Sequence, residues 1–179
     1  ADPEIFKEIQ YDWGRILSHL REQAYLTRGL KITVMDARPK QEHDHRSHAF
    51  YFEGGVRSYI LYLNRALEPR HETIFYALKD HEDIAIEIAL QYVDDLQSRE
   101  SSFANNIHTP EGGMHLTGFR TALTRTLNDH ARKNGILKSE DDNLTGDDVR
   151  EGLTAIVSIK IREPQFEGQT KAKLGNPEA

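Results

Sequence analysis

The 179-residue sequence contains no cysteine, one tryptophan and two methionines. The lack of cysteine excludes disulfide bonds, thiol catalysis and cysteine-ligated zinc, and it is compatible with a reducing compartment. No long uninterrupted apolar run is present, so no membrane-spanning helix is expected. The N-terminal segment has no basic region followed by an apolar stretch, so no secretory signal is predicted.

Acidic side chains outnumber basic ones, 29 to 23, which gives a formal net charge of −6. This balance disfavours a protein whose whole surface binds nucleic acid, although a local basic face remains compatible with it. With 37% hydrophobic and 29% charged residues, the composition is that of a soluble globular domain. The length suits either one ordinary domain or one domain with a piece of a neighbour. Because the chain opens on Ala1 without a methionine, we expect it to be an excised piece.

The spacing of apolar residues predicts an α+β fold. It indicates helices at 12–28, 56–67 and about 113–135, and strands at 30–35, 72–78, 84–93, 99–106 and 153–161. Asp12 and Thr145 are expected to cap helices, and the short gap at 79–83 predicts a hairpin. Alternation of isoleucine with small or polar residues in 84–93 predicts one buried face. Together these elements predict a mainly antiparallel sheet backed by two helices.

The sequence contains no complete active site. Neither phosphate-binding glycine motif is present, and no His-Glu-x-x-His motif is found. Three histidines cluster in the charged segment 36–48, at positions 43, 45 and 48. That segment has the composition of a solvated junction, and metal sites draw their ligands from ordered elements, so we predict no metal site there.

A second segment imitates a calcium-binding loop. The Asp, Asn and Gly offsets in residues 141–147 match such a loop, but Gly152 stands where it needs a bidentate glutamate. A turn followed by a helix cap explains the same residues, so no calcium site is predicted.

Two further features allow either a functional or a structural interpretation. Arg120, Arg125, Arg132 and Lys133 give the helix at 111–133 a local charge of +2 after Glu111 and Asp129 are subtracted. This helix is either a phosphate-facing stripe or an ordinary solvated face. In residues 166–171, a glycine is followed by an amide, a hydroxyl and an ammonium group. Such a loop can reach an anion, although most polar loops are only structural.

Long segments resemble the B subunits of DNA gyrase, which are type IIA topoisomerases. The matching segments are 2–6, 20–36, 52–64, 103–128, 144–161 and 164–179. The resemblance implies that residues 1–37 are the last helix and strand of the ATP-binding domain. Residues 38–179 then form the transducer domain, truncated before its exit helix. The resemblance also implies a left-handed βαβ crossover in the sheet, which general rules of handedness would not predict.

The resemblance assigns roles to three residues. Lys171 of the Gln-Thr-Lys loop is expected to contact the γ-phosphate in the neighbouring ATP site, with Gln169 assisting. Arg120 matches an arginine on the helix that faces the transported DNA. The nucleotide pocket, its magnesium-binding asparagine and the DNA-cleaving tyrosine of the enzyme are missing from this chain. We therefore expect ATP and Mg²⁺ to be cofactors of the full-length enzyme, and this piece alone to be inactive.

The resemblance implies a coupling function. ATP binding and hydrolysis in the adjacent ATPase domain would drive DNA strand passage and negative supercoiling by an ATP-dependent topoisomerase. The implied partners are the gyrase A subunit, double-stranded DNA and a second copy of the gyrase B subunit. A cytoplasmic location without membrane contact is expected. Two alternatives stay open: the transducer domain of the topoisomerase IV B subunit, and a non-enzymatic α+β module that binds nucleic acid or protein through the helix at 111–133.

Overall fold

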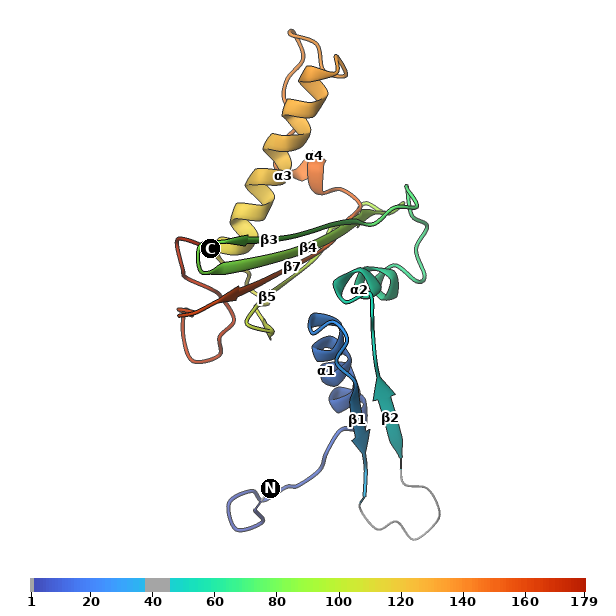
Figure 1. The fold of residues 1–179 in the computed structure, drawn as a ribbon, viewed down its shortest axis with the longest axis vertical. Helices are drawn as coiled ribbons and strands as arrows, with labels where there is room; N and C mark the ends of the chain where they lie inside the picture. Colours follow the sequence, from blue (N-terminus) through green and yellow to red (C-terminus); the bar gives the residue numbers. More distant parts are fainter. Residues whose placement is uncertain (1, 38–45) are drawn as a thin grey trace. The chain divides into compact units, whose positions relative to one another are not determined.

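A computed structural model describes residues 2–37 and 46–179 (Figure 1). The chain divides into two compact units, Ala1–Ser58 and Tyr59–Ala179. Contacts define these units, whereas the expected boundary at residues 37 and 38 concerns domains of a longer protein and stays a prediction. Within the described residues, no helix has the length and hydropathy needed to cross a membrane.

The first unit pairs one helix with a small sheet. It contains α1 (Trp13–Leu26) and the antiparallel strands β1 (Ile32–Met35) and β2 (Ser47–Phe50). The expected cap is confirmed, because Asp12 Oδ1 accepts a hydrogen bond from the Arg15 amide at 3.1 Å. His48 lies exposed on β2, while the other two histidines of the predicted cluster, 43 and 45, lie outside the described residues.

The second unit is built on a five-stranded sheet in the order β3-β4-β7-β5-β6. Its strands are β3 (Phe75–His81), β4 (Ile84–Tyr92), β5 (Arg99–Ala104), β6 (Ile107–His108) and β7 (Leu153–Ile161). All neighbouring pairs are antiparallel except β5 and β7, which are parallel. The predicted hairpin is confirmed, since β3 and β4 meet at a tight turn through Glu82, whose φ is +52°.

Three helices accompany this sheet. They are α2 (Val56–Leu63), which crosses the boundary between the units, the long α3 (Met114–Lys133) and the short α4 (Gly146–Arg150). Figure 1 shows α3 and α4 on one side of the sheet. The fold is therefore α+β with a mainly antiparallel sheet, as predicted. The connection from β5 to β7 passes through α3, which supplies the parallel crossover that the resemblance implies. The left hand of that crossover stays a prediction.

Strand β4 is buried on both faces, which corrects the expectation of one buried face. Ala89 and Gln91 are 0% and 3% exposed, although they lie opposite the isoleucine face. Asn64, just after α2, donates its Nδ2 to Gln91 Oε1 at 2.9 Å and accepts from Thr154 Oγ1 at 2.7 Å. Each amide or hydroxyl in this network has a partner, so the polar face can be buried without a large cost.

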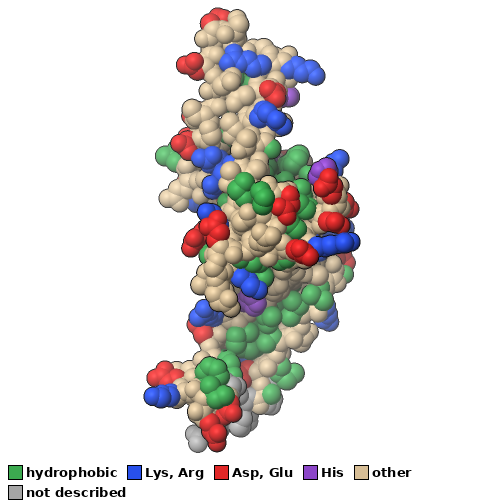
Figure 2. Space-filling model, turned by 90° about the vertical axis from the view of Figure 1, so that its left-hand side faces the viewer, with side chains coloured by type: hydrophobic (Ala, Val, Ile, Leu, Met, Phe, Trp, Pro, Cys, Tyr) green, Lys and Arg blue, Asp and Glu red, His purple; other side chains and the backbone are tan. Residues whose placement is uncertain are grey.

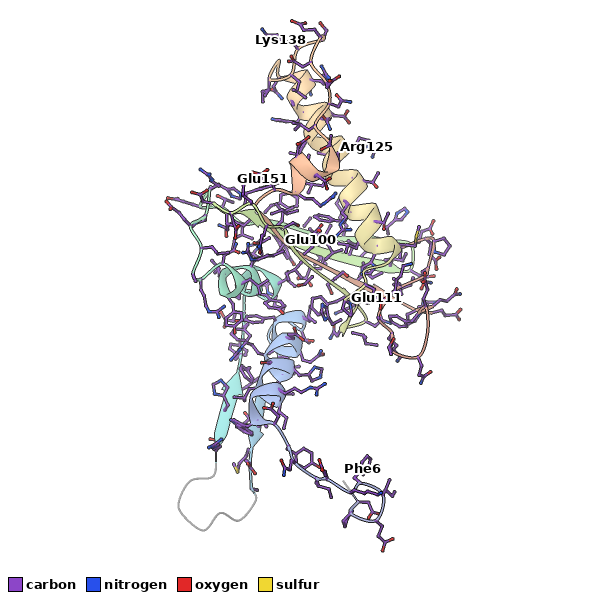
Figure 3. All side chains as sticks on the ribbon, turned by 180° about the vertical axis from the view of Figure 1, so that it is seen from behind. Phe6, Glu100, Glu111, Arg125, Lys138 and Glu151 are labelled. Carbon is purple, nitrogen blue, oxygen red and sulfur yellow. The ribbon has the colours of Figure 1, made fainter. Side chains whose placement is uncertain are left out.

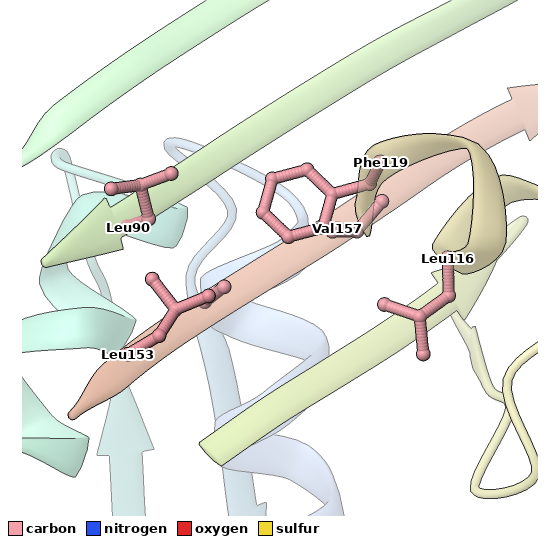
Figure 4. Packing of buried hydrophobic residues seen from close by; sticks show 6 residues of the cluster. Leu90, Leu116, Phe119, Leu153 and Val157 are labelled. Atoms are coloured by element: carbon pink, nitrogen blue, oxygen red, sulfur yellow. The ribbon is translucent and has the colours of Figure 1, made fainter. Parts of the chain in front are cut away.

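The main core lies between α3 and the sheet. Leu116 and Phe119 of α3 lie over Leu90 of β4 and Val157 of β7 (Figure 4). Burying each such side chain contributes about 1.5–3 kcal/mol. Beside this core, Ile86 and other apolar side chains of the sheet and α3 border a hollow of about 530 Å³. The face of α3 that carries Leu116 and Phe119 is thus the face that holds the helix on the sheet.

Candidate functional site

The predicted phosphate-contacting residues lie on an exposed loop after β7, residues 165–175, which we call the Lys171 loop. Its two sides pair like a narrow hairpin: the Glu167 amide donates to the Lys173 carbonyl at 2.9 Å, and the Gly175 amide to the Gln165 carbonyl at 2.7 Å. Gly168, with a φ of +90°, and Lys171, with a φ of +56°, turn the chain at the tip. The structure therefore presents the Gln-Thr-Lys residues at the end of a paired loop.

Lys171 is exposed, and its ammonium group lies over the aromatic ring of Phe166. Its Nζ lies 5.7 Å from the centroid of the Phe166 ring, within the range of a cation–π contact. The nearby Glu167 instead pairs with Lys173, at 3.1 Å. No ion pair to Lys171 is found within residues 2–37 and 46–179. The ammonium group is thus available to an incoming anion.

The base of the loop is held by a buried amide side chain. Asn176 is 1% exposed, accepts from the Gln165 amide at 2.6 Å and donates to the Glu163 carbonyl at 3.1 Å. Leu174 is fully buried and packs with Ala104 and other residues of the sheet. The exposed tip is therefore attached to a base that buried contacts fix in place.

The same loop is bonded to the segment that enters α3. The Glu111 amide donates to the Ala172 carbonyl at 3.0 Å, and the Leu174 amide donates to the Gly112 carbonyl at 3.1 Å. Met114, the first residue of α3, donates its amide to the Leu174 carbonyl at 3.1 Å. Figure 3 labels Glu111 near this start of α3. The Lys171 loop and α3 thus share a short parallel ladder of backbone hydrogen bonds.

Arg120 lies on α3, but its charge has a close partner. Its Nε and Nη2 donate to the Glu100 carboxylate at 3.1 and 2.6 Å. The Glu100 side chain is 6% exposed, and its hydrogen bond is the main cause that raises the pKa of the Arg120 guanidinium. Arg120 is therefore a charged anchor between α3 and β5, and its partner Glu100 is labelled in Figure 3.

The other basic residues of α3 divide between two roles. Arg132 donates to carbonyl oxygens of the following loop, at Lys138 and at Asp141, and so holds that loop. Arg125 is exposed, and no hydrogen bond or ion pair of its side chain is found in the described part of the chain. Figure 2 shows basic side chains in its upper part, where α3 lies, with acidic side chains between them. Two of the four basic residues, Arg120 and Arg132, therefore have structural partners, whichever of the two interpretations of this helix holds.

A polar hollow of about 510 Å³ lies between α3 and α4. Arg120, Arg125 and Arg150 line it together with the amide side chains of Asn128 and Asn143. Arg150 is paired with the exposed Asp147 at 2.6 Å. Asn128 donates its amide hydrogens to the Thr124 and Leu144 carbonyls, and Asp129 adds a carboxylate to the lining. The guanidinium groups are therefore the main donors that the hollow can offer to phosphate oxygens.

The segment that imitates a calcium loop is occupied with helix capping, as predicted. Thr145 Oγ1 accepts from the Asp148 amide at 3.2 Å, and Asp148 accepts from the Thr145 amide at 2.7 Å. Asp141 accepts from the Lys138 amide at 2.7 Å. Across the residues that the structure describes, no group of three or more His, Asp or Glu side chains is arranged to hold a metal.

Sequence reasoning missed a buried histidine beside the loop base. His115 is 4% exposed, and burial lowers its pKa from 6.5 to about 4. Its Nε2 lies 3.4 Å from Thr109 Oγ1, while its Nδ1 is buried without a hydrogen-bond partner among the described residues. A neutral imidazole fits this burial, because a charged ring would have two buried N–H donors and only one partner among the described residues. No periodic signal marks this position, because His115 is the second residue of α3 and a polar residue in the first turn of a helix is usually exposed.

Three comparisons with known proteins bear on this site. The profile of the family described as DNA gyrase B matches residues 55–179. The DNA gyrase B subunit of Bacillus mycoides is 52% identical over 179 residues, which are 99% of this chain and 43% of that protein. Its counterpart from Streptococcus pyogenes serotype M3 (strain ATCC BAA-595 / MGAS315) is 52% identical over 178 residues, 99% of this chain and 27% of that protein.

A solved structure agrees with these relatives. The crystal structure of the 43K ATPase domain of Thermus thermophilus gyrase B in complex with an aminocoumarin matches with a TM-score of 0.84 and 37% identity. The match covers 99% of this chain and 46% of that one.

The fold and sequence together define a region of a type II topoisomerase subunit. The chain belongs to the DNA gyrase B family, and it spans less than half the length of the relatives it matches.

Proposed function

We propose that this chain is the transducer portion of a gyrase B subunit, preceded by the last elements of the ATP-binding domain. It couples ATP binding and hydrolysis to DNA strand passage and negative supercoiling. Family membership and the likeness to the Thermus gyrase B ATPase domain support a role beside an ATP site. The observation that carries the proposal is an exposed lysine, without an ion pair among the described residues, on a loop bonded to the longest helix.

The chemistry of the loop fits a triphosphate held by another part of the protein. The chain has no phosphate-binding glycine motif of its own, and the Gln-Thr-Lys tip is exposed. Lys171 supplies a compact positive charge, and Gln169 supplies a neutral amide donor. Placed at the γ-phosphate, these groups stabilise the charge that spreads over the phosphoryl oxygens in the transition state.

ATP and Mg²⁺ belong to the whole enzyme in this proposal. The residues of this chain that would meet the nucleotide are Gln169 and Lys171, whose donors match phosphate oxygens and not a metal ion. Bound Mg²⁺ would neutralise phosphate charge. Mg²⁺ needs several oxygen ligands, whereas the Lys171 ammonium group has none and Gln169 has a single amide oxygen. We therefore propose that other residues of the whole enzyme hold the metal.

Contact between the loop and the γ-phosphate makes the nucleotide a conformational switch. The triphosphate bridges two parts of the protein, whereas the diphosphate leaves the lysine without its partner. The proposed partners are the gyrase A subunit, a second copy of the B subunit, and duplex DNA; the cytoplasm is the proposed location. In the DNA contact proposed for Arg120, Nη1 and the second N–H of Nη2 would meet a phosphate, because the Glu100 carboxylate accepts from Nε and from only one N–H of Nη2.

The proposal predicts the effect of Lys171→Ala in the full-length protein in complex with gyrase A. ATP binding, measured with a nonhydrolysable analogue, should persist. Hydrolysis and ATP-dependent supercoiling should fall by about 10²–10³, because one charge donor to the transition state is lost. Steady-state ATPase turnover is the measurement.

Lys173→Ala is the matched control, since Lys173 lies on the same loop but pairs with Glu167. It should keep turnover within about twofold of wild type, as surface ion pairs contribute little. Unchanged turnover in Lys171→Ala, or an equal loss in Lys173→Ala, would remove the proposed role of the lysine.

One observation favours a second candidate, a module that binds nucleic acid without catalysis. The hollow between α3 and α4 gathers three arginines, two of them on the helix at 111–133. Against it, the family profile and the relatives are all named for gyrase B. The same names support gyrase over topoisomerase IV. Assays of the whole enzyme that compare its supercoiling activity with its decatenation activity would distinguish these two.

A further inference from the structure

Helix α3 begins without a side-chain cap among the described residues. Its N-cap residue is Gly113, which has no side chain to accept a hydrogen bond from the first turn. The carbonyl of Leu174, on the Lys171 loop, accepts from the Met114 amide at 3.1 Å. The loop thus satisfies one of the amides that a helix start leaves free. A shift of Leu174 would therefore leave the first amide of the helix without this partner.

Only glycine fits at the contact. Gly113 has a φ of +140°, and a Cβ placed on it would lie 2.4 Å from the Leu174 carbonyl oxygen and 2.6 Å from the Leu174 nitrogen. Both neighbours are backbone atoms of a fully buried residue, so neither can turn aside as a flexible side chain would. The close approach of the two backbones therefore depends on the missing side chain.

The loop base has a second attachment at Asn176. Its amide group accepts from the Gln165 amide and donates to the Glu163 carbonyl and to Glu178 Oε1, at 2.6, 3.1 and 2.8 Å. These bonds join the segment that leaves β7 to the segment that returns from the tip. Lys171 is three residues before Leu174, at most about 10 Å of extended chain. The attachments therefore restrict where the ammonium group can reach.

We infer that Gly113 and Asn176 are positioning residues for Lys171. Gly113 lets the base of the Lys171 loop lie against the start of α3, and Asn176 ties the two sides of that base together. The ammonium group is thereby aimed at the phosphate, and a displacement of the tip is transmitted to α3. This inference rests on the proposed function. It adds a mechanical path between the nucleotide contact and the helix that carries Arg120 and Arg125.

The test is a double-mutant cycle in the full-length protein in complex with gyrase A. Turnover and KM for ATP are measured for wild type, Gly113→Ala, Lys171→Ala and the double variant. Gly113→Ala should lower turnover by about 10- to 100-fold, the range expected when a reacting group is misplaced by about 1 Å. KM should change by less than about threefold. The double variant should be no slower than Lys171→Ala, because the group being positioned is already gone.

Two further variants keep the test decisive. Gly118→Ala lies on the same helix, where an added Cβ meets nothing closer than 3.8 Å, and it should keep turnover within about twofold of wild type. If Gly113→Ala fails to fold, Asn176→Asp replaces it, since this change keeps the acceptor for the Gln165 amide and removes the donor to Glu163. Asn176→Asp should lower turnover about tenfold, again with no further loss on top of Lys171→Ala.

The outcomes separate the inference from the proposed function. Wild-type turnover in Gly113→Ala, or losses that multiply in the double variant, would overturn the positioning role while the effect of Lys171→Ala stands. Wild-type turnover in Lys171→Ala would overturn the proposed function itself.

Discussion

Lys171, Arg120 and Arg132 carry the same charge but differ in what surrounds them. Lys171 rests on an aromatic ring and has no carboxylate partner among the described residues. Arg120 is tied to a nearly buried carboxylate, and Arg132 holds backbone carbonyls of the next loop. A positive charge that is already paired gains less from a phosphate, because binding must first replace the existing partner. Among these three residues, Lys171 is therefore the best placed to respond to a nucleotide.

Buried His115 should make folding sensitive to acid. Burial lowers its pKa from 6.5 to about 4 in the folded chain, so the unfolded chain takes up a proton first as pH falls. The free energy of unfolding is therefore unaffected by this group above pH 6.5 and decreases as pH falls toward 4. The total decrease due to His115 is roughly 3 kcal/mol. His115→Gln should flatten this part of the profile when unfolding free energy is measured by urea titration between pH 7 and pH 4.5.

The exposed His81→Gln is the control for this measurement, and it should keep the pH dependence of the wild type. A profile for His115→Gln as steep as that of the wild type would show that the buried imidazole is not the source of the acid sensitivity.

The first turns of α3 and α4 find partners for their free backbone amides in two different ways. Helix α4 carries its own capping box, in which hydrogen bonds from Thr145 hold the pKa of Asp148 below its usual value. Helix α3 instead obtains a partner for its first amide from the Lys171 loop. A helix with a local cap is independent of distant segments, whereas α3 depends on the position of Leu174.

Removing the cap of α4 should have a modest cost. Thr145→Ala removes the acceptor for the Asp148 amide and should lower the free energy of unfolding by about 1 kcal/mol. Urea denaturation followed by circular dichroism is the measurement. The exposed loop substitution Ser139→Ala should stay within about 0.5 kcal/mol of wild type. Equal losses in the two variants would mean that the capping box contributes nothing specific.

Helices, strands and caps were largely predictable, because they depend on spacings of two to four residues. The predicted strand at 99–106 shows where this reasoning fails. Strand β5 ends at Ala104, and Asn105 and Asn106, with φ values of +50° and +63°, turn the chain into β6. Asparagine tolerates this left-handed conformation. The Asn-Asn pair was a turn signal inside an otherwise continuous strand pattern.

For the molecule as a whole, net charge opposes tight binding to DNA. With a charge of −6, the 179-residue chain should bind duplex DNA no tighter than about 1 µM at ~150 mM salt, and the affinity should fall steeply as salt rises. Fluorescence anisotropy with a labelled duplex measures this. Arg125→Ala should weaken whatever binding remains more than Lys133→Ala does, because Arg125 lines the hollow between α3 and α4. Tighter binding that survives ~150 mM salt would favour the non-enzymatic binding module.

The amino-acid sequence by itself determined the α+β class, the order of the elements apart from β2 and β6 and, through its resemblance to gyrase B, the candidate residues Gln169, Lys171 and Arg120. Only the tertiary structure decided the surroundings of those residues. Glu100 and Arg120, which are 20 positions apart in the sequence, are hydrogen-bonded. Gly113 and Leu174 also pair, although the whole of β7 lies between them in the sequence. Periodicity reports interactions within a few residues, whereas these contacts arise when the parallel pairing of β5 and β7 brings distant segments together.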